Sequence, residues 1–383
     1  MSDQALSDQT PQPTIIDHTA ERRSLAQTHL RKFFEAAAKY EASDLLLRGG
    51  RIPKLRLRTE LKPLEAEPLN VAKFERAVEQ SLSEEQWRLY SQQGSIDVGV
   101  DLDDETRFRI NIYRTRGRSA IAARRISNAI LTYESLNLPS VMSKITQARQ
   151  GLVLVCGITG SGKSTTIASM IQEINISRPC HIITIEDPIE YLFRDERAIV
   201  SQREIGIDVP DFTIGLRALV REDPDVVVIG EMRDKETFES ALQAAETGHL
   251  VFVTIHASNT SQAFGRIYDL FPANERDAIR NMLGFHMQAF ICQRLLPALR
   301  EEMQLVPAVE VLLQSPPTRK HILGGREHEL EEVIRSHRDA GMQTFADSLV
   351  ELVNKEYIHP RVAQDAADSP EEIKMRLRGI KAE

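Results

Sequence analysis

The sequence predicts an α/β protein in which a small α+β domain precedes a larger domain built on a parallel sheet. Two observations lead to this prediction. From residue 151 to residue 256, wholly apolar strand-like segments alternate with helical segments, as in sheets that helices cover on both faces. Before residue 130, three strand-like segments follow one another with no helix between them, which is typical of an antiparallel sheet.

The composition is that of an ordinary globular protein. The chain has 383 residues, of which 42% are hydrophobic and 27% charged, and its net charge is -8. This acidic balance argues against a general nucleic-acid-binding protein. The three cysteines are far apart and form no C-x-x-C pair, so neither a zinc site nor a disulfide framework is expected. The apolar runs are far shorter than the roughly twenty residues that span a bilayer, and no apolar signal segment opens the chain, so we expect a cytosolic protein.

The first part of the chain divides into a leader, a small domain and a connection. Residues 1–24 are rich in Ser, Gln, Pro, Thr and Asp and are expected to form a flexible leader. Residues 25–130 are expected to form the α+β domain, with helices near 25–38 and 72–92, strands near 45–50 and 54–64, and three strands that start near 96, 108 and 119. Residues 131–150 are expected to be a linker with a short helix.

The second domain is expected to span residues 151–313 and to be followed by a helical subdomain over 314–383. Four buried-type strands start at Gly151, His181, Asp225 and His249. Between the first two, a helix that begins at Lys163 carries its apolar residues on one face. This alternation predicts a doubly wound α/β domain.

The segment GITGSGKS, residues 157–164, matches the pattern G-x-x-x-x-G-K-[ST] between a buried strand and a helix. Glycines let the backbone turn its N–H groups toward phosphate oxygens, and the helix start adds the positive end of its dipole. The lysine reaches the β- and γ-phosphates, and the serine hydroxyl joins a magnesium shell. The sequence therefore predicts a site for ATP and Mg²⁺ whose contacts are Gly157, Thr159, Gly160, Ser161, Gly162, Lys163, Ser164 and Thr165. The alternative is a glycine-rich turn without a ligand.

Two acidic residues follow strands of the same predicted sheet. The pair Glu186-Asp187 closes HIITIED and Glu231 follows DVVVIG, and ligands of open α/β sheets bind beyond the carboxyl ends of the strands. Glu231 is predicted to orient or deprotonate the attacking water, or to hold Mg²⁺ through water. The alternatives are a charged cap on a strand end for Glu231 and a turn shaped by Asp187-Pro188 for Glu186.

Histidines and arginines supply the remaining candidates. His249 and His256 flank the strand LVFVTI. Each is either a hydrogen-bonded structural residue or a residue beside the γ-phosphate that responds to the nucleotide state. Seven arginines crowd residues 107–125. Most of them are expected to form a solvated basic face, but one or two are candidates to neutralise charge on the triphosphate, as arginine fingers do.

Several motifs together make a family resemblance. GITGSGKST, IEDPIEY, LVREDPDVVVIGEMRD and AETGHLVFVTIHA resemble the Walker A, Asp box, atypical Walker B and His box of the type IV pilus retraction ATPases, the PilT/PilU group of the secretion-ATPase superfamily. The resemblance runs from about Arg31 to the C-terminus. Within the group the likeness to PilU is the greater, on segments such as IHASNTSQAFGRIYDLFP.

The resemblance implies a PAS-like N-terminal domain, a RecA-like ATPase domain and a homo-hexameric ring. It implies that Glu231 and Glu186 are the catalytic carboxylates and that His249 and His256 are functional. It also suggests Arg109 and Arg124 as phosphate contacts from the first domain. The implied partners are a PilT-type ATPase and an inner-membrane platform protein, so the chain is expected at the cytoplasmic side of the pilus base. The four-cysteine zinc clamp of the related extension ATPases is missing, so no zinc is expected.

Three hypotheses follow from the sequence. The first is a motor that hydrolyses ATP to power or assist pilus retraction. The second is an adaptor ring that binds nucleotide but acts chiefly by docking on a PilT-type partner. The third is a nucleic-acid translocase, which the acidic balance disfavours because a groove that tracks a strand is expected to be basic.

Overall fold

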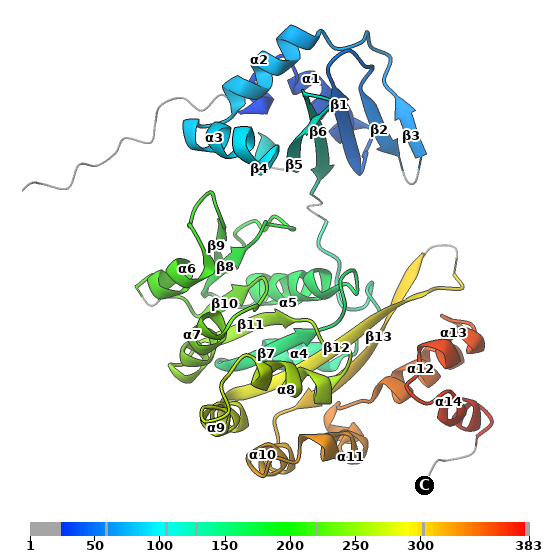
Figure 1. Cartoon of the computed structure of the whole chain (residues 1–383). Coiled ribbons are helices and arrows are strands. Elements are labelled where there is room, and N and C mark those ends of the chain that lie inside the picture. The colour runs from blue at the N-terminus through cyan, green and yellow to red at the C-terminus, as the bar shows by residue number, and fades with distance from the viewer. Residues whose placement is uncertain are drawn as a thin grey trace, which may run out of the picture. The chain divides into compact units, whose positions relative to one another are not determined.

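The computed structural model describes residues 24–57, 60–103, 106–126, 129–219, 221–300 and 303–379. Apart from Ser24, the expected leader lies outside these residues. The chain forms two compact units, Met1–Ile126 and Ser127–Glu383, which are described separately here (Figure 1). The division after Ile126 falls close to the domain boundary expected at residue 130.

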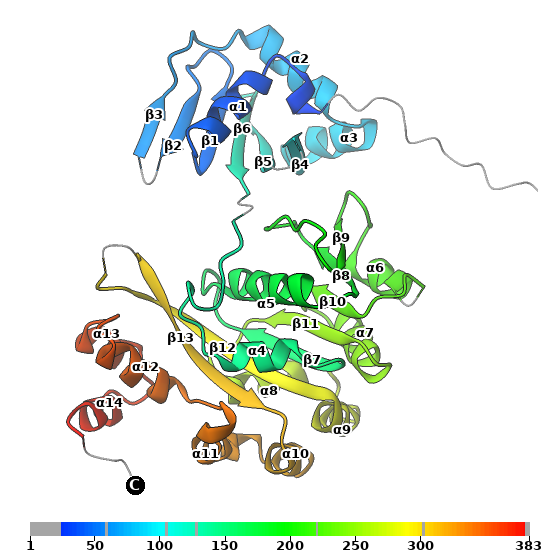
Figure 2. The same ribbon diagram turned by 180° about the vertical axis from the view of Figure 1, so that it is seen from behind.

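The first unit is built on a six-stranded antiparallel sheet in the order β3-β2-β1-β6-β5-β4, which can be followed in Figure 2. Its hydrophobic core includes the edge-to-face pair Phe34 and Phe108, whose ring centroids are 5.1 Å apart. The elements are η1 (Leu25–Gln27), α1 (Arg31–Lys39), β1 (Asp44–Arg48), β2 (Lys54–Leu57), β3 (Glu60–Pro63), α2 (Val71–Ser81), α3 (Glu84–Gln93), β4 (Ser95–Asp103), β5 (Thr106–Thr115) and β6 (Arg118–Arg125). The expected α+β fold of this part is confirmed.

Three expected elements of this unit are each divided in the structure. The helix expected near 25–38 is the short 3-10 helix η1 followed by α1. The strand expected over 54–64 is the antiparallel pair β2 and β3, in which Leu57 lies opposite Glu60. The helix expected over 72–92 is two helices, α2 and α3. Ser83 caps α3 in a reciprocal box with Gln86, and this box starts a new helix where the apolar pattern alone predicts continuation.

The second unit is built on a seven-stranded sheet in the order β13-β12-β7-β11-β10-β8-β9. All neighbouring strands are parallel except β12 and β13, which form an antiparallel hairpin. The strands are β7 (Gly151–Cys156), β8 (His181–Glu186), β9 (Ile199–Glu204), β10 (Val226–Ile229), β11 (Leu250–Ile255), β12 (Met287–Pro297) and β13 (Leu305–Leu313). The prediction of an α/β domain with a mainly parallel sheet is confirmed.

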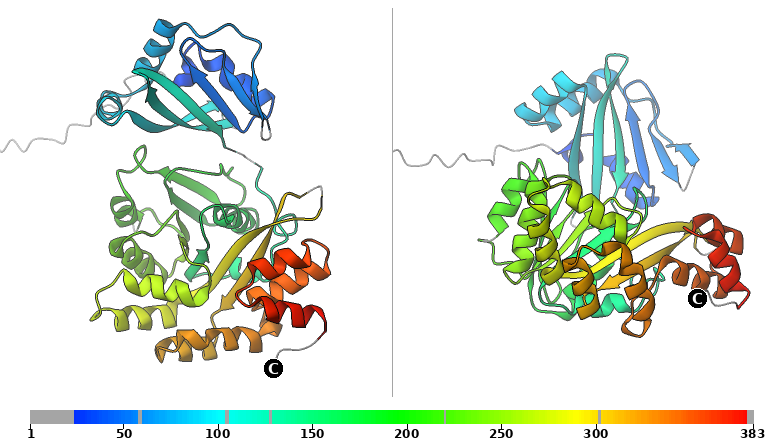
Figure 3. Two further views of the ribbon diagram at one scale, coloured as in Figure 1. Left: turned by 45° about the vertical axis from the view of Figure 1, so that its right-hand side comes forward. Right: turned by 60° about the horizontal axis from the view of Figure 1, so that its bottom comes forward.

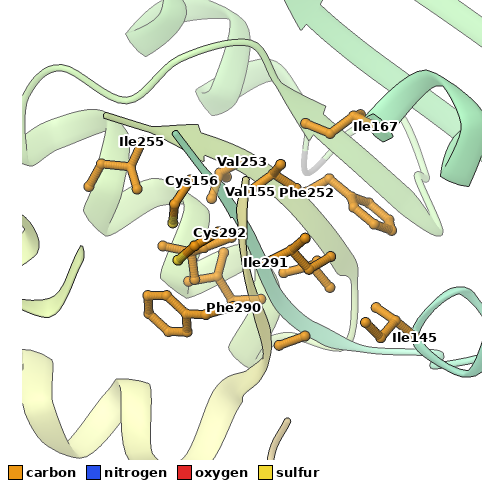
Figure 4. Close-up of a cluster of buried hydrophobic side chains, with 14 of the residues drawn as sticks. Ile145, Val155, Cys156, Ile167, Phe252, Val253, Ile255, Phe290, Ile291 and Cys292 are labelled. Atoms are coloured by element: carbon orange, nitrogen blue, oxygen red, sulfur yellow. The ribbon is translucent and has the colours of Figure 1, made fainter. Parts of the chain in front are cut away.

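Apolar side chains fill both faces of this sheet, because β7, β10 and β11 are buried along their whole length. In Figure 4, Ile145 and Ile167 lie on one side of the strands, and Phe290 and Cys156 lie on the other. The helices of the α/β core are α4 (Val141–Thr146), α5 (Lys163–Ser177), α6 (Phe212–Leu219), α7 (Lys235–Glu246), α8 (Thr260–Asp269) and α9 (Arg276–His286). The packed sheet fixes where each strand ends, and therefore where the polar residues that follow the strands lie.

Helices also make up the C-terminal part of the second unit. They are α10 (Pro316–Leu323), η2 (Glu327–Glu329), α11 (Leu330–Ser336), η3 (Arg338–Ala340), α12 (Phe345–Asn354), α13 (Pro360–Ala366) and α14 (Pro370–Leu377). Helix α12 packs on β13 and α13 packs on β12, as Figure 3 shows in orange and red beside the yellow hairpin. Within the described part of the chain, none of the helices is both long and apolar enough to cross a bilayer.

Candidate nucleotide-binding and catalytic site

The glycine loop joins the carboxyl end of β7 to the start of α5. Gly162 has φ +86°, a left-handed conformation that glycine adopts without strain. Gly157 must be glycine because neighbouring atoms leave no room for a Cβ. A Cβ there would overlap Ser161 Oγ and would lie 2.7 Å from the carbonyl oxygen of Gln293. Both ends of the loop therefore depend on the absence of a side chain.

The polar groups of this loop suit a phosphate ligand. Lys163 Nζ donates hydrogen bonds to the carbonyl oxygens of Gly157, at 2.9 Å, and Ile158, at 3.1 Å, which holds the ammonium against the loop. Burial lowers the pKa of Lys163, and the nearby Glu231 carboxylate opposes that shift. Ser161 Oγ is buried and has no hydrogen-bond partner among the described residues. No side chain caps the helix start at Gly162, so the first N–H groups of α5 remain for an anion.

Glu231 lies two residues beyond the carboxyl end of β10 and is held between two cationic or ionisable side chains. Its Oε2 accepts a hydrogen bond from Arg233 Nη2 at 2.6 Å, and His256 Nε2 lies 2.9 Å from its Oε1. Partial burial favours the neutral acid, but Arg233 and His256 outweigh burial and lower the pKa of Glu231. The Glu231 side chain is therefore an ionised carboxylate at neutral pH.

Glu186 is the last residue of β8, on the neighbouring strand, and has the opposite environment. Its carboxylate accepts hydrogen bonds from Thr184 Oγ1 at 2.7 Å, Gln202 Nε2 at 3.2 Å and the backbone N–H of Glu190 at 3.4 Å. Burial nevertheless dominates these bonds and raises the pKa of Glu186. Two carboxyl groups with pKa values shifted in opposite directions thus follow adjacent strands, an arrangement that suits acid–base chemistry.

The raised pKa of Glu186 predicts a pH-dependent stability difference. The folded protein binds a proton on Glu186 more tightly than the unfolded chain. The contribution of Glu186 to wild-type stability therefore falls as pH rises from the ordinary carboxyl pKa of 4.5 toward the raised folded value. Glu186→Gln stays neutral throughout. We expect its melting temperature, measured without nucleotide, to rise relative to wild type across this window and to keep that advantage at higher pH.

The exposed variant Glu196→Gln controls for the general effect of removing one negative charge. A melting-temperature difference between Glu186→Gln and wild type that does not change as the pH rises from 4.5 would contradict this interpretation of Glu186.

The structure separates the two histidines that flank β11. His256 follows the carboxyl end of the strand and reaches Glu231. His249 precedes the amino end, and its Nδ1 lies 2.8 Å from the carbonyl oxygen of Ala244 at the end of α7. Six strand residues at about 3.3 Å each put roughly 20 Å between the two ends of β11. The structure therefore does not bring His249 to the site of its own chain, because His249 lies at the opposite edge of the sheet, and its catalytic role stays a prediction.

Arg109 and Arg124 belong to the first unit. They lie directly opposite each other on β5 and β6, and both side chains are exposed. Arg124 Nε also pairs with Asp44 Oδ1 at 3.0 Å. The two arginines thus share one solvent-facing row of the sheet, and their contact with phosphate stays a prediction.

Three residues of this site were not among the sequence predictions. Tyr191 OH lies 2.7 Å from Thr165 Oγ1, Gln293 contacts the glycine loop, and Arg233 binds Glu231. Tyr191 lies within the motif IEDPIEY and Arg233 within GEMRD, which also hold Glu186 and Glu231. Their place in these motifs could have indicated them as site residues. Gln293 comes from β12, 127 residues after its hydrogen-bond partner Thr166, and no local pattern indicates it.

The donor set also fits magnesium. Mg²⁺ prefers oxygen ligands and usually keeps waters and substrate phosphates in its shell, so one or two protein oxygens suffice. The Ser164 hydroxyl at the start of α5 and the ionised Glu231 carboxylate are donors of that kind. Among the described residues, no group of three or more His, Cys, Asp or Glu side chains forms a metal site independent of substrate.

A glycine loop between a buried parallel strand and a helix, with carboxylates at the ends of neighbouring strands, defines a P-loop nucleoside triphosphatase. The sequence matches the family described as "Type II/IV secretion system protein" over residues 19–349. This chain belongs to that family.

Named relatives cover most of the chain. A twitching motility protein of Neisseria gonorrhoeae is 37% identical over 83% of this chain and 85% of its own length. The type IV pilus ATPase PilU of Pseudomonas aeruginosa is 34% identical over 88% of each chain. The type IV pilus retraction ATPase PilT of the same organism is 35% identical over 88% of this chain and 97% of its own. The resemblance to the PilT/PilU group is confirmed, and these nearly equal identities do not separate PilU from PilT.

Solved structures agree with this placement. The crystal structure of the pilus retraction motor PilT with bound ADP has a TM-score of 0.82 and 37% identity, and the match covers 91% of this chain and 99% of that one. The ATPase DotB of Legionella pneumophila has a TM-score of 0.77 and 25% identity over 92% and 96% of the two chains. The fold of this chain is therefore that of the secretion and pilus ATPases.

Proposed function

We propose that this chain is an ATP-hydrolysing motor that powers or assists type IV pilus retraction. The observation that carries the proposal is the arrangement at one edge of the parallel sheet. There the loop around Lys163 follows β7, while His256 and Glu231 follow the next two strands, β11 and β10. The similarity to PilT, whose crystal structure holds ADP, supports nucleotide as the ligand and retraction as the output.

In this proposal the residues of the site bind the nucleotide or take part in its hydrolysis, and Glu231 does both. The loop N–H groups and Lys163 bind the phosphates. Ser164, with Glu231 acting through a bound water, would hold Mg²⁺, which would neutralise charge on the phosphate oxygens. The Glu231 carboxylate accepts the proton of the water that attacks the γ-phosphorus, as the bond to the β,γ-bridging oxygen breaks and ADP leaves. His256 fixes the orientation of Glu231, and Glu186 serves as the second, more readily protonated carboxyl group.

The remaining tasks are proposed for an assembled homo-hexamer. Arg109 and Arg124 supply positive charge to the triphosphate from the first unit, which their exposure on one sheet row supports. The ring acts at the cytoplasmic side of the inner membrane, together with a PilT-type ATPase and the membrane platform protein of the pilus. The relatives named PilU and PilT support this setting.

Twitching motility tests the proposal. A strain that lacks this gene is complemented with the wild-type protein or with Lys163→Ala, in the presence of its intact PilT-type ATPase. We expect wild type to restore motility and Lys163→Ala to fail at equal protein level. Full motility with Lys163→Ala would instead favour an adaptor that acts by docking on the partner.

A further inference from the structure

Strand β12 continues past the last residue that it pairs with β7, and so reaches the phosphate loop. The final pair is Cys292 opposite Cys156, after which Gln293 runs alongside Gly157. The two backbones are close, because a Cβ on Gly157 would lie 2.7 Å from the carbonyl oxygen of Gln293. Gln293 is only 3% exposed, so this contact is shielded from water.

The side chain of Gln293 contacts the other end of the same loop. Its Oε1 accepts a hydrogen bond of 2.7 Å from Thr166 Oγ1 in the first turn of α5, and Thr166 is 1% exposed. Its Nε2 would lie 2.7 Å from a Cβ on Gly162. One buried residue therefore touches the first glycine of the loop with its backbone and the last glycine with its side chain.

These contacts fix the geometry on which anion binding depends. The loop binds phosphate through the direction of its N–H groups, so the relative position of its two ends sets how well those groups converge. A buried hydrogen bond between two neutral side chains adds no charge to the site. Its effect on nucleotide affinity must come from holding the loop in shape.

We propose that Gln293 is a positioning residue for the phosphate loop, and that it presets the distance between Gly157 and Gly162 through its bond to Thr166. The inference rests on the proposed nucleotide-binding function. If Gln293 served only as the hydrogen-bond partner of the buried Thr166, its replacement would lower the stability of the protein. Nucleotide affinity would then fall only as far as this loss of stability explains. The positioning role requires affinity to fall more than stability explains.

The test compares Gln293→Met, Thr166→Val and the double variant in the full-length protein. Calorimetry measures the Kd for ADP with Mg²⁺, and melting temperatures are taken without nucleotide. Each single variant is expected to raise Kd about tenfold, the loss of roughly one buried hydrogen bond. The Kd of the double variant for ADP is expected to be no higher than that of either single variant, because both substitutions remove the same hydrogen bond. Thr166→Ser keeps the hydroxyl donor and is expected to retain wild-type affinity.

Gln343→Met is the matched control, because Gln343 is half-buried and donates from Nε2 to the carbonyl oxygen of Val309 at 2.7 Å, in a different part of the second unit. It is expected to lower the melting temperature and leave Kd unchanged. The proposal is overturned if Gln293→Met binds ADP like wild type, or if the effects of the two single variants add. If wild-type protein itself binds no nucleotide, the proposed function fails rather than the role of Gln293.

Discussion

Lys163→Ala is expected to lower ATP turnover by about a hundredfold to a thousandfold, the usual loss when one donor to developing transition-state charge is removed. The structure supports this expectation because the Lys163 ammonium is held inside the glycine loop, where two loop carbonyls orient it and burial excludes much of the water. No other cation of the loop can replace it. The measurement is the steady-state rate of phosphate release at saturating ATP.

A matched control removes a lysine of the same unit far from the loop in sequence. Lys374 on α14 has a side chain that is 47% exposed, so Lys374→Ala is expected to keep the wild-type rate. Wild-type turnover by assembled Lys163→Ala would refute the assignment of the loop as the phosphate site.

Glu231→Gln is expected to leave ATP bound but to slow its hydrolysis by about a hundredfold to ten-thousandfold, the range for loss of a general base. The amide keeps the size of the side chain and one acceptor oxygen, but it cannot take a proton. In the wild type, Arg233 and His256 lower the pKa of Glu231 and keep it ionised. Binding and turnover are therefore measured separately, by calorimetry with an ATP analogue that is not hydrolysed and by phosphate release.

Glu236→Gln is the control for this experiment, because Glu236 is an exposed residue in the first turn of the neighbouring helix α7. Equal losses of affinity and turnover in Glu231→Gln would mean that Glu231 chiefly binds the nucleotide complex. Unchanged turnover would exclude it as the base.

The local patterns of the sequence are sufficient to predict the loop and the acidic residues of this site. Parallel strands end at a common edge, so the chain direction alone brings Glu186 at the end of β8, Glu231 after β10 and His256 after β11 to that edge. The same rule places His249 at the opposite edge of the sheet, because His249 precedes its strand. The expectation that His249 is functional came from the family resemblance and not from the strand order.

Contacts between distant segments could not be predicted in this way. Gln293 reaches the loop only because β12 lies beside β7 and extends beyond it, and the apolar pattern of β12 does not specify that neighbour. The opposite pKa shifts of Glu186 and Glu231 likewise depend on burial and on the reach of Arg233, which are properties of the packed fold. In the first unit, Ser83 and Gln86 have the spacing of a capping box, which marks the start of α3. The apolar pattern alone predicted one continuous helix there.

The most direct test of the account is a calorimetric titration of the assembled protein with ATP and Mg²⁺, using wild type and Lys163→Ala side by side. The account predicts saturable binding by wild type, with heat that depends on Mg²⁺, and a large loss of affinity in Lys163→Ala. Absence of binding by wild type, or equal binding by both proteins, would contradict it.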